Sequence, residues 1–315
     1  MPTPIAIVRL RAYAGPNIHG PQPGVLLQIS APTNYARRLR DAIRDGAQAI
    51  GMVIAYLETE AHPRDTGFLI EARFTSGEPP IAADLCRFIV DGICAEADGN
   101  EEWNRDEPLV ALQARYRAAA MPVAALQLRA EARSRGLPWL ALPSGRLQIG
   151  YGACGWQYDP QADTAPSPPW SQLGSIPLTL VSGWASRSTA VAHYAAQIAA
   201  IGMPVRSADG LDFEGLRDLL SDPSVEAAVV GLDSQSLIMR GLPVDRCDHA
   251  VICDLAGPRP PAAADDEEWL RALGLPMFLS PNPVQINLAD ARLHPLIPYA
   301  PNGVINAELS DICTE

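Results

Sequence analysis

The sequence predicts an α+β N-terminal domain followed by an α/β domain with a mainly parallel sheet. Residues 1–100 contain strand-like segments in pairs beside segments of helical spacing, whereas residues 175–315 alternate strand and helix. Between these parts, Asp159–Gly174 contains four prolines and no periodicity, which is typical of a crossing loop. We therefore expect domains at 1–100 and 175–315, joined by a helical connector and proline-rich linker at 101–174.

In the N-terminal domain, the predicted strands alternate apolar and polar residues, and the predicted helices carry apolar residues every three or four positions. The strands are Ile5–Tyr13, Val25–Ser30 and Gly67–Thr75. The helices are Asn34–Leu57 and Ala82–Cys94. The turn Gly15-Pro16-Asn17 separates the first two strands, because glycine and proline both interrupt regular structure. We expect the helices to cover one face of the paired strands.

The connector and the C-terminal domain follow the same rules. In the connector we predict helices at 99–120 and 122–135, the second ending at Gly136, and strands at 138–142 and 146–152. In the C-terminal domain we predict strands at 178–182, 225–231, 250–254 and 276–280, and helices at 188–201 and 267–273. The acidic run Asp265–Glu268 suits the first turn of the last helix, because carboxylates stabilise the positive end of a helix dipole. The tail from Pro281 is expected to be irregular.

The basic residues are unusual, because all 24 are arginine and the chain has no lysine. This excludes a Schiff base, a lysine general base and the lysine of a standard phosphate-binding loop. A net charge of −12 argues against binding to nucleic acid or to an anionic membrane, since both depend on clustered basic residues. A basic partner is compatible with this charge.

The cysteines and histidines indicate neither disulfides nor a metal centre. The six cysteines are Cys86, Cys94, Cys154, Cys247, Cys253 and Cys313. They show no close pairing, and neither end of the chain resembles a signal peptide or a membrane span. We therefore expect reduced thiols in a cytoplasmic protein, with no metal site.

Three blocks of sequence resemble the cyanophycin synthetase family, in the order in which that family carries them. The turn Gly15-Pro16-Asn17 is similar to the start of those enzymes. Glu131–Pro138 (EARSRGLP), continuing to Leu147–Gly152 (LQIGYG), resembles the passage at the entry to their ATP-grasp domain. Asp222–Val230 (DPSVEAAVV) and Met239–Ile252 (MRGLPVDRCDHAVI) resemble their Mur-ligase-like domain. The resemblance implies a P-loop-type parallel sheet over 175–315.

The same resemblance implies that the chain lacks much of the family's machinery. Cyanophycin synthetases use two ATP sites to add aspartate and arginine to a polymer through acyl phosphates. Their ATP-grasp domain would stand between Gly152 and Ile176, where this chain has only about two dozen residues. The connector 101–174 is thus expected to hold a remnant of the entry to that domain.

The second ATP site would use a phosphate loop with the pattern G-T-N-G-K-T-T, which aligns here with Gly183-Trp-Ala-Ser-Arg-Ser-Thr189. Such loops bind phosphate through backbone N–H groups, a lysine, and a hydroxyl on magnesium. The altered positions are Ser186, where a Cβ opposes a left-handed backbone, and Arg187, a planar cation in place of lysine. Ser188 and Thr189 keep the hydroxyls. Two interpretations remain: a modified nucleotide loop, or a helix start capped by Ser186 or Ser188.

The family's magnesium-binding glutamate aligns with Gly231, and the nearest carboxylate is Asp233. Asp233 is either a residual metal ligand or a helix cap. The family's later Asp-His pair is also missing, although Asp254 lies close to its place. With lysine, metal carboxylate and histidine all absent or altered, we assign no catalytic residue.

Arg37, Arg38, Arg40 and Arg44 lie along one predicted helix. Arginine binds carboxylates in bidentate geometry, so these residues are candidates for holding an acidic polymer or peptide. The alternative is a solvated helix face that pairs with nearby acids.

These observations lead to three hypotheses. In the first, the chain is a catalytically inactive subunit, without cofactor, that assembles with a full-length cyanophycin-synthetase-like ligase and also with its own copy. In the second, it is an ATP-dependent amide ligase that uses Mg-ATP in a remodelled loop. In the third, it is a stand-alone module that binds acidic or arginine-containing peptides.

Overall fold

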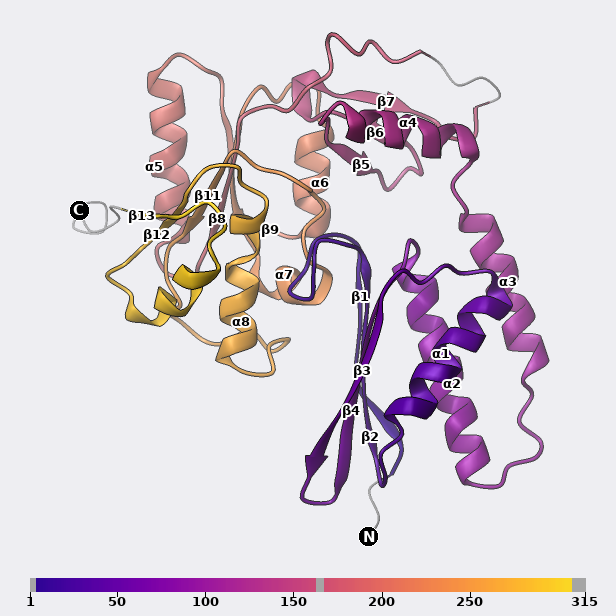
Figure 1. The fold of residues 1–315 in the computed structure, drawn as a ribbon. Helices are drawn as coiled ribbons and strands as arrows, with labels where there is room; N and C mark the ends of the chain where they lie inside the picture. The colour runs from indigo at the N-terminus through magenta and orange to yellow at the C-terminus, as the bar shows by residue number, and fades with distance from the viewer. Residues whose placement is uncertain (1–3, 163–166, 308–315) are drawn as a thin grey trace. The chain divides into compact units, whose positions relative to one another are not determined.

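The computed structural model describes residues 4–162 and 167–307. The chain divides into two compact units (Figure 1). The first unit is Met1–Gly15 with His19–Ala120, and the second unit is Pro16–Ile18 with Met121–Glu315. The division after Ala120 falls within the segment 101–174 that the sequence marks as a connector.

The first unit contains a four-stranded antiparallel sheet in the order β1-β2-β4-β3. Its strands are β1 (Ala6–Tyr13), β2 (Gly24–Ala31), β3 (Leu57–Arg64) and β4 (Gly67–Thr75). The prediction that the helix from Asn34 continues to Leu57 is wrong. The helix ends at Ile50, because Gly51 adopts a left-handed φ of 80° that closes its last turn, and Leu57 then begins the edge strand β3.

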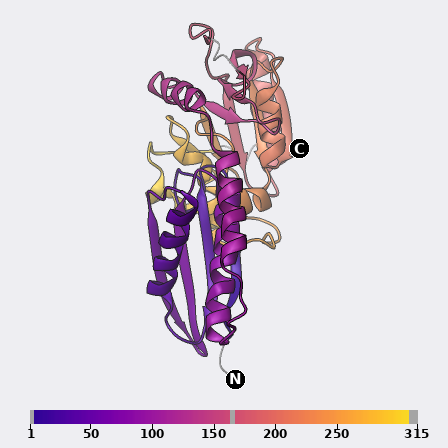
Figure 2. The ribbon, with the colours of Figure 1, turned by 90° about the vertical axis from the view of Figure 1, so that its right-hand side faces the viewer.

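Helices α1 (Ala36–Ile50) and α2 (Pro79–Ala97) cover one face of this sheet, as predicted, and α3 (Asp106–Ala119) adds Leu112 to the same core (Figure 2). Ile43 and Leu85 from the helices are fully buried in one cluster with Leu27 and Ile29 from β2. Each such side chain contributes roughly 1.5–3 kcal/mol when it leaves water. The apolar spacing of α1 and α2 therefore fixes which face of the sheet the helices cover.

The second unit begins with a small module of one helix and three strands. Helix α4 (Val123–Ser134) packs on an antiparallel sheet of β5 (Trp139–Ala141), β6 (Leu147–Ile149) and β7 (Trp156–Tyr158). The sequence predicts α4, β5 and β6 but not β7. A 3-10 turn, η1 (Gly152–Cys154), links β6 to β7.

The rest of the second unit is built on a six-stranded, entirely parallel sheet in the order β13-β12-β11-β8-β10-β9. Its strands are β8 (Leu178–Ser182), β9 (Arg206–Leu211), β10 (Ala228–Leu232), β11 (His249–Ile252), β12 (Val284–Ile286) and β13 (Val304–Asn306). The predicted α/β class with a mainly parallel sheet is thus confirmed at this level. Strands β8, β10 and β11 are buried on both faces, which is typical of parallel sheets.

Helices lie on both faces of the parallel sheet (Figure 1). They are α5 (Arg187–Ala200), α6 (Phe213–Ser221), α7 (Ser234–Arg240) and α8 (Asp266–Leu273). Val191 of α5 packs with Val181 and Val229 on one face, whereas Leu216 of α6 and Leu273 of α8 share the core of the other face. The acidic first turn of α8 is confirmed, since Asp265 caps the helix by accepting from the Glu268 N–H.

Two predictions at the C-terminal end are wrong. Pro276–Ser280 is not a strand, because η2 (Leu275–Phe278) forms a 3-10 turn there. The tail after Pro281 is not irregular, because it supplies β12, the 3-10 segment η3 (Ala291–Tyr299) and β13. Strands of three residues carry almost no local pattern, so pairing with β11 rather than local sequence decides that β12 forms. Elements β9, α6 and α7 are also absent from the prediction.

The thiol prediction concerns five described cysteines, since Cys313 lies outside the described residues. None of the five forms a disulfide. Burial raises the pKa of the Cys86 and Cys247 thiols, which keeps them protonated at neutral pH. Over 4–162 and 167–307, no helix combines the length and apolar character needed to cross a membrane.

Candidate functional site

The candidate site lies at the carboxyl edge of the parallel sheet, where ligands bind in open α/β folds. The segment Gly183–Arg187, which we call the 183–187 loop, follows the central strand β8 and opens α5. Asp209 lies within the edge strand β9, which pairs with β10, whereas Asp233 follows β10 and Asp254 follows β11. Parallel strands thus bring to one edge three carboxylates that are far apart in sequence.

The backbone N–H groups of the 183–187 loop point at the carboxylate of Asp254. The N–H groups of Trp184 and Ala185 donate to Oδ1 at 3.2 and 3.0 Å, and that of Ser186 donates to Oδ2 at 2.7 Å. The Ala256 N–H adds a fourth bond to Oδ1 at 3.0 Å. Asp254 is only 5% exposed. The place where a bound anion would lie at the start of α5 is therefore filled by a carboxylate of the chain itself.

Gly183 makes this arrangement sterically feasible. Its φ is 141°, and a Cβ there would lie 2.9 Å from the Cβ of Cys253 and 3.2 Å from the Asp254 backbone nitrogen. Ser186, by contrast, has φ −94° and ψ 0°, so the loop does not need the left-handed backbone that a serine Cβ opposes. The loop is thus shaped to bring β8 and β11 together without strain at Ser186.

Arg187 is held by its own neighbours. Its Nε donates to Oδ1 of Asp209 at 2.6 Å, and its Nη1 donates to the Leu232 carbonyl at 2.9 Å. The arginine side chain is 15% exposed. Gly231 leaves the space for this ion pair, because a Cβ at 231 would lie 2.0 Å from Asp209 Oδ1. The cation that aligns with a phosphate-binding lysine is therefore already paired inside the protein.

Ser186, Ser188 and Asp233 lie at the starts of helices α5 and α7. Ser186 stands at the N-cap position of α5, but its side chain makes no capping hydrogen bond, and Ser188 and Thr189 lie within the first turn. Asp233 is the N-cap of α7 and accepts from the Ser236 N–H at 2.7 Å, which is the capping role considered from sequence. No group of three or more His, Cys, Asp or Glu residues suited to a metal ion occurs among the described residues.

Asp290 supports the segment that carries Asp254. Its Oδ2 accepts from the Leu255 N–H at 3.0 Å, and its Oδ1 accepts from the Arg292 Nε at 2.8 Å. These bonds, led by that of Arg292, lower the pKa of Asp290 to about 2. Sequence reasoning placed Asp254 near the site without a role and missed Asp209 and Asp290. No short motif marks them, because the sheet topology alone brings them to this edge.

The arginines of α1 in the first unit contrast with Arg187. Arg38 is turned toward Glu96 and the Tyr35 ring. Arg37, Arg40 and Arg44, which we call the α1 arginine row, are three and four residues apart and so share a helix face. In this row, Arg37 is 94% exposed and makes only a long contact, 3.9 Å, with the carboxylate of Asp41. The Nε of Arg40 donates a hydrogen bond to the Thr59 hydroxyl. Arg44 is exposed and has no ion pair among the described residues.

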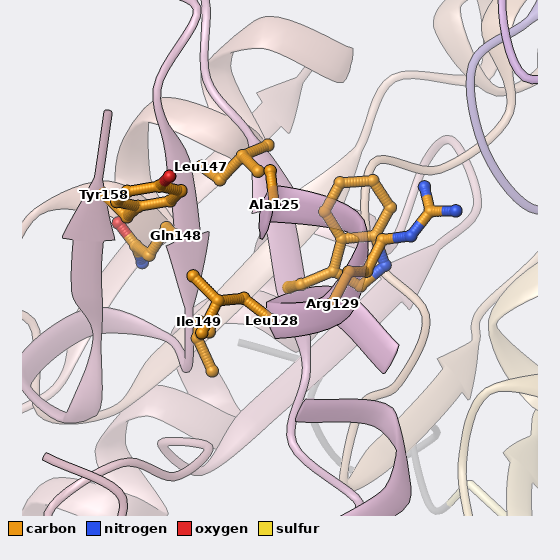
Figure 3. A pocket seen from close by; sticks show the side chains of 8 residues that line it. Ala125, Leu128, Arg129, Leu147, Gln148, Ile149 and Tyr158 are labelled. Carbon is orange, nitrogen blue, oxygen red and sulfur yellow. The ribbon is translucent and has the colours of Figure 1, made fainter. Parts of the chain in front are cut away.

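Two hollows of the second unit lie away from the 183–187 loop. A small hollow of about 10 Å³ lies beneath α4, between Ala125, Leu128 and Tyr158, and holds no more than one water (Figure 3). A larger, open cleft of about 410 Å³ runs along β9 and α6, past Arg206 and Leu219. Because Asp254 fills the loop, the geometry there favours a closed structural site over an open nucleotide site.

Comparison with known proteins identifies a family without assigning an activity. The family model described as Domain of unknown function (DUF4938) matches residues 4–307, nearly the whole chain. The chain belongs to the DUF4938 family. A search of curated proteins finds no match.

Proposed function

We propose that this chain is a catalytically inactive, cyanophycin-synthetase-like subunit that assembles with an active ATP-dependent peptide ligase of the same family. In this proposal the second unit is a Mur-ligase-like domain that no longer binds nucleotide. The first unit and the outer surfaces then supply the docking, substrate-holding or regulatory role.

The observation that carries the proposal is the occupied 183–187 loop. A nucleotide phosphate would need the N–H groups of Trp184, Ala185 and Ser186, and all three already donate to Asp254. It would also meet the negative charge of Asp254 in a site that is almost closed to solvent. Arg187 cannot assist without leaving Asp209. ATP would therefore have to displace a buried, four-fold hydrogen-bonded carboxylate before it could bind.

The fold is compatible with this relationship. A parallel sheet whose central strand runs directly into a loop and a helix is the arrangement that P-loop domains use. Two residues of the block that resembles the family are packed: Tyr151 is fully buried, and the backbone of Gly152 lies against Val225. The proposal thus combines a retained scaffold with a phosphate site that is closed by internal contacts.

The first test is binding of Mg-ATP by calorimetry, using the full chain and the variant D254A. We expect no heat of binding from the wild-type chain at millimolar nucleotide. Binding gained by D254A would identify the carboxylate as the group that excludes ATP. Binding by the wild-type chain would overturn the proposal and favour the ATP-dependent amide ligase.

The second test mixes the chain with a full-length cyanophycin-synthetase-like ligase and follows co-elution and the rate of ATP consumption. We expect a complex, and a rate or product length that differs from that of the ligase alone. A chain that neither co-elutes with the ligase nor alters its rate would contradict the subunit proposal.

The α1 arginine row supports a substrate-holding role in particular. Its three guanidinium groups extend about 10 Å along the helix at 1.5 Å per residue, a spacing that an extended acidic peptide can follow. We expect the full chain to bind poly-aspartate, and R37Q/R40Q/R44Q to lose at least about tenfold in affinity. The matched control is R64Q/R105Q/R117Q, three exposed arginines of the same unit on β3 and at α3. An equal loss of affinity in both variants would show that binding depends on net charge alone and not on the α1 arginine row.

A further inference from the structure

The small module at the start of the second unit has a surface unlike the rest of the chain. Residues 121–158 contain four arginines and one glutamate, a net charge of +3, whereas the remaining 20 arginines and 35 acidic residues sum to −15. The module also concentrates aromatic rings. Arg129 lies over the Trp139 ring at 5.0 Å, and Trp156 stacks on Tyr158 with centroids 6.0 Å apart. Arginine and large aromatic residues are enriched at the centres of protein interfaces.

Helix α4 carries the exposed part of this surface. Its inner side buries Ala125 and Ala132. On its outer side, Val123 is 70% and Leu126 is 41% exposed. Arg129 and Arg133 continue the same line at intervals of three and four residues and are exposed. We call these four residues the α4 face: apolar at its start and basic at its end.

An acidic counterpart exists on α8 of the same unit. Asp266 and Glu267 are exposed in its first turn, and the Asp266 side chain is 75% exposed and lies 3.6 Å from Arg259. Asp265 holds the turn in place by capping it, so the two carboxylates are presented on a fixed helix end. Within one copy, α4 and α8 lie well apart in the second unit, so they cannot pair with each other (Figure 1).

We propose that the α4 face docks on a second copy of this chain, with Arg129 and Arg133 against Asp266 and Glu267 at the start of α8 of that copy. Complementary charges that cannot meet within one copy can meet between two. Val123 and Leu126 then leave water at the centre of the contact, and the charged pairs set its register. This proposal does not depend on the nucleotide loop or on a partner ligase.

The test is sedimentation velocity of the full chain over a range of concentrations and salt. We expect self-association with a Kd on the order of 10–100 µM, the range of small, charged interfaces, weakened several-fold between about 0.05 and 0.5 M NaCl. The charge reversals R129E/R133E and D266R/E267R should each abolish it. V123S/L126S should weaken it without removing its salt dependence.

The decisive variant combines R129E/R133E with D266R/E267R, because the swapped charges are again complementary. Association should return in this variant, which also excludes misfolding as the cause of loss in the separate reversals. The matched control R105E/R117E changes two exposed arginines of the first unit and should associate like the wild-type chain. A wild-type chain that stays monomeric at low salt, or a combined variant that does not regain association, would overturn the proposal.

Discussion

The 183–187 loop and the α1 arginine row present the same cation in opposite settings. Arg187 is 15% exposed and is bonded to Asp209 and to the Leu232 carbonyl. Arg37 is 94% exposed, and its nearest acid is 3.9 Å away. One site satisfies its positive charge from within the protein, whereas the other leaves its charge in water.

This difference follows from burial. A charge or a helix N-terminus taken out of water must be paired, because an unpaired one costs several kcal/mol. The 183–187 loop meets this requirement within the chain, because its N–H groups donate to the carboxylate of Asp254. In the α1 arginine row, Arg37 and Arg44 remain exposed, and a ligand that pairs with them would compete at most with the Arg40–Thr59 hydrogen bond and the long contact between Arg37 and Asp41. The α1 arginine row is therefore better placed than the 183–187 loop to bind a ligand.

Replacing Asp254 should have the largest effect. In D254A, the N–H groups of Trp184, Ala185 and Ser186 lose their acceptor in a nearly buried place, so we expect a loss of about 3–5 kcal/mol in the free energy of unfolding. Urea denaturation measures this loss. The matched control is D222A, since Asp222 accepts from the backbone and hydroxyl of Ser224, lies 4.0 Å from Arg206 at an exposed position, and should cost less than about 1 kcal/mol. Equal losses in the two variants would show that Asp254 is not the special acceptor of the loop.

A methyl group at Gly231 should have the next largest effect. The new Cβ would lie 2.0 Å from Asp209 Oδ1 and 3.1 Å from Val191 Cγ2, so Asp209 must release Arg187. We expect a loss of about 2 kcal/mol. The loss should be smaller when G231A is made in a D209A background, because the clash is then absent. A double-mutant cycle from denaturant unfolding measures this coupling, and strictly additive losses would argue against the clash.

Asp290, which holds the segment that carries Asp254, makes the stability of the fold depend on pH. Arg292, together with the Leu255 N–H, lowers the pKa of Asp290 to about 2, below the value of an unfolded aspartate near 4. The group therefore stabilises the fold above about pH 4, and this contribution is lost as the pH falls toward 2. We expect D290N to lower the melting temperature at pH 7 and to approach the wild type as the pH falls. D41N, whose parent carboxylate faces only the exposed Arg37, should show no such convergence.

How far the sequence predicts this fold depends on the length of each element. Helices α1 and α2 and strands β8 and β10 carry enough apolar residues to show a period, and the prediction finds them. Strands β7, β12 and β13 have three residues each and no predicted segment around them, so only their pairing partners reveal them, whereas the equally short β5 and β6 lie within the longer predicted segments 138–142 and 146–152. Strand β9, with the sequence RSADGL, has little apolar content because it is an exposed edge strand.

The candidate site was predictable only in part. The sequence marks Ser186 and Arg187 as departures from a phosphate loop and so indicates that the loop has changed there. It does not indicate what replaces the phosphate. Asp254 lies 70 residues after Trp184, and Asp209 lies 22 residues after Arg187, so only strand order brings them to the loop. A contact of this kind has no local sequence signal.

The smallest effect on stability is expected from the α1 arginine row. Each of R37Q, R40Q and R44Q should change the free energy of unfolding by no more than about 0.5 kcal/mol, because the row forms few internal bonds. R187Q should cost about 2 kcal/mol, because it breaks the bonds to Asp209 and to the Leu232 carbonyl in a place that is largely buried. Thermal melts of the four single variants measure this contrast. If the row proved as costly to remove as Arg187, its arginines would belong to the fold rather than to a binding surface, and the poly-aspartate experiment would lose its rationale.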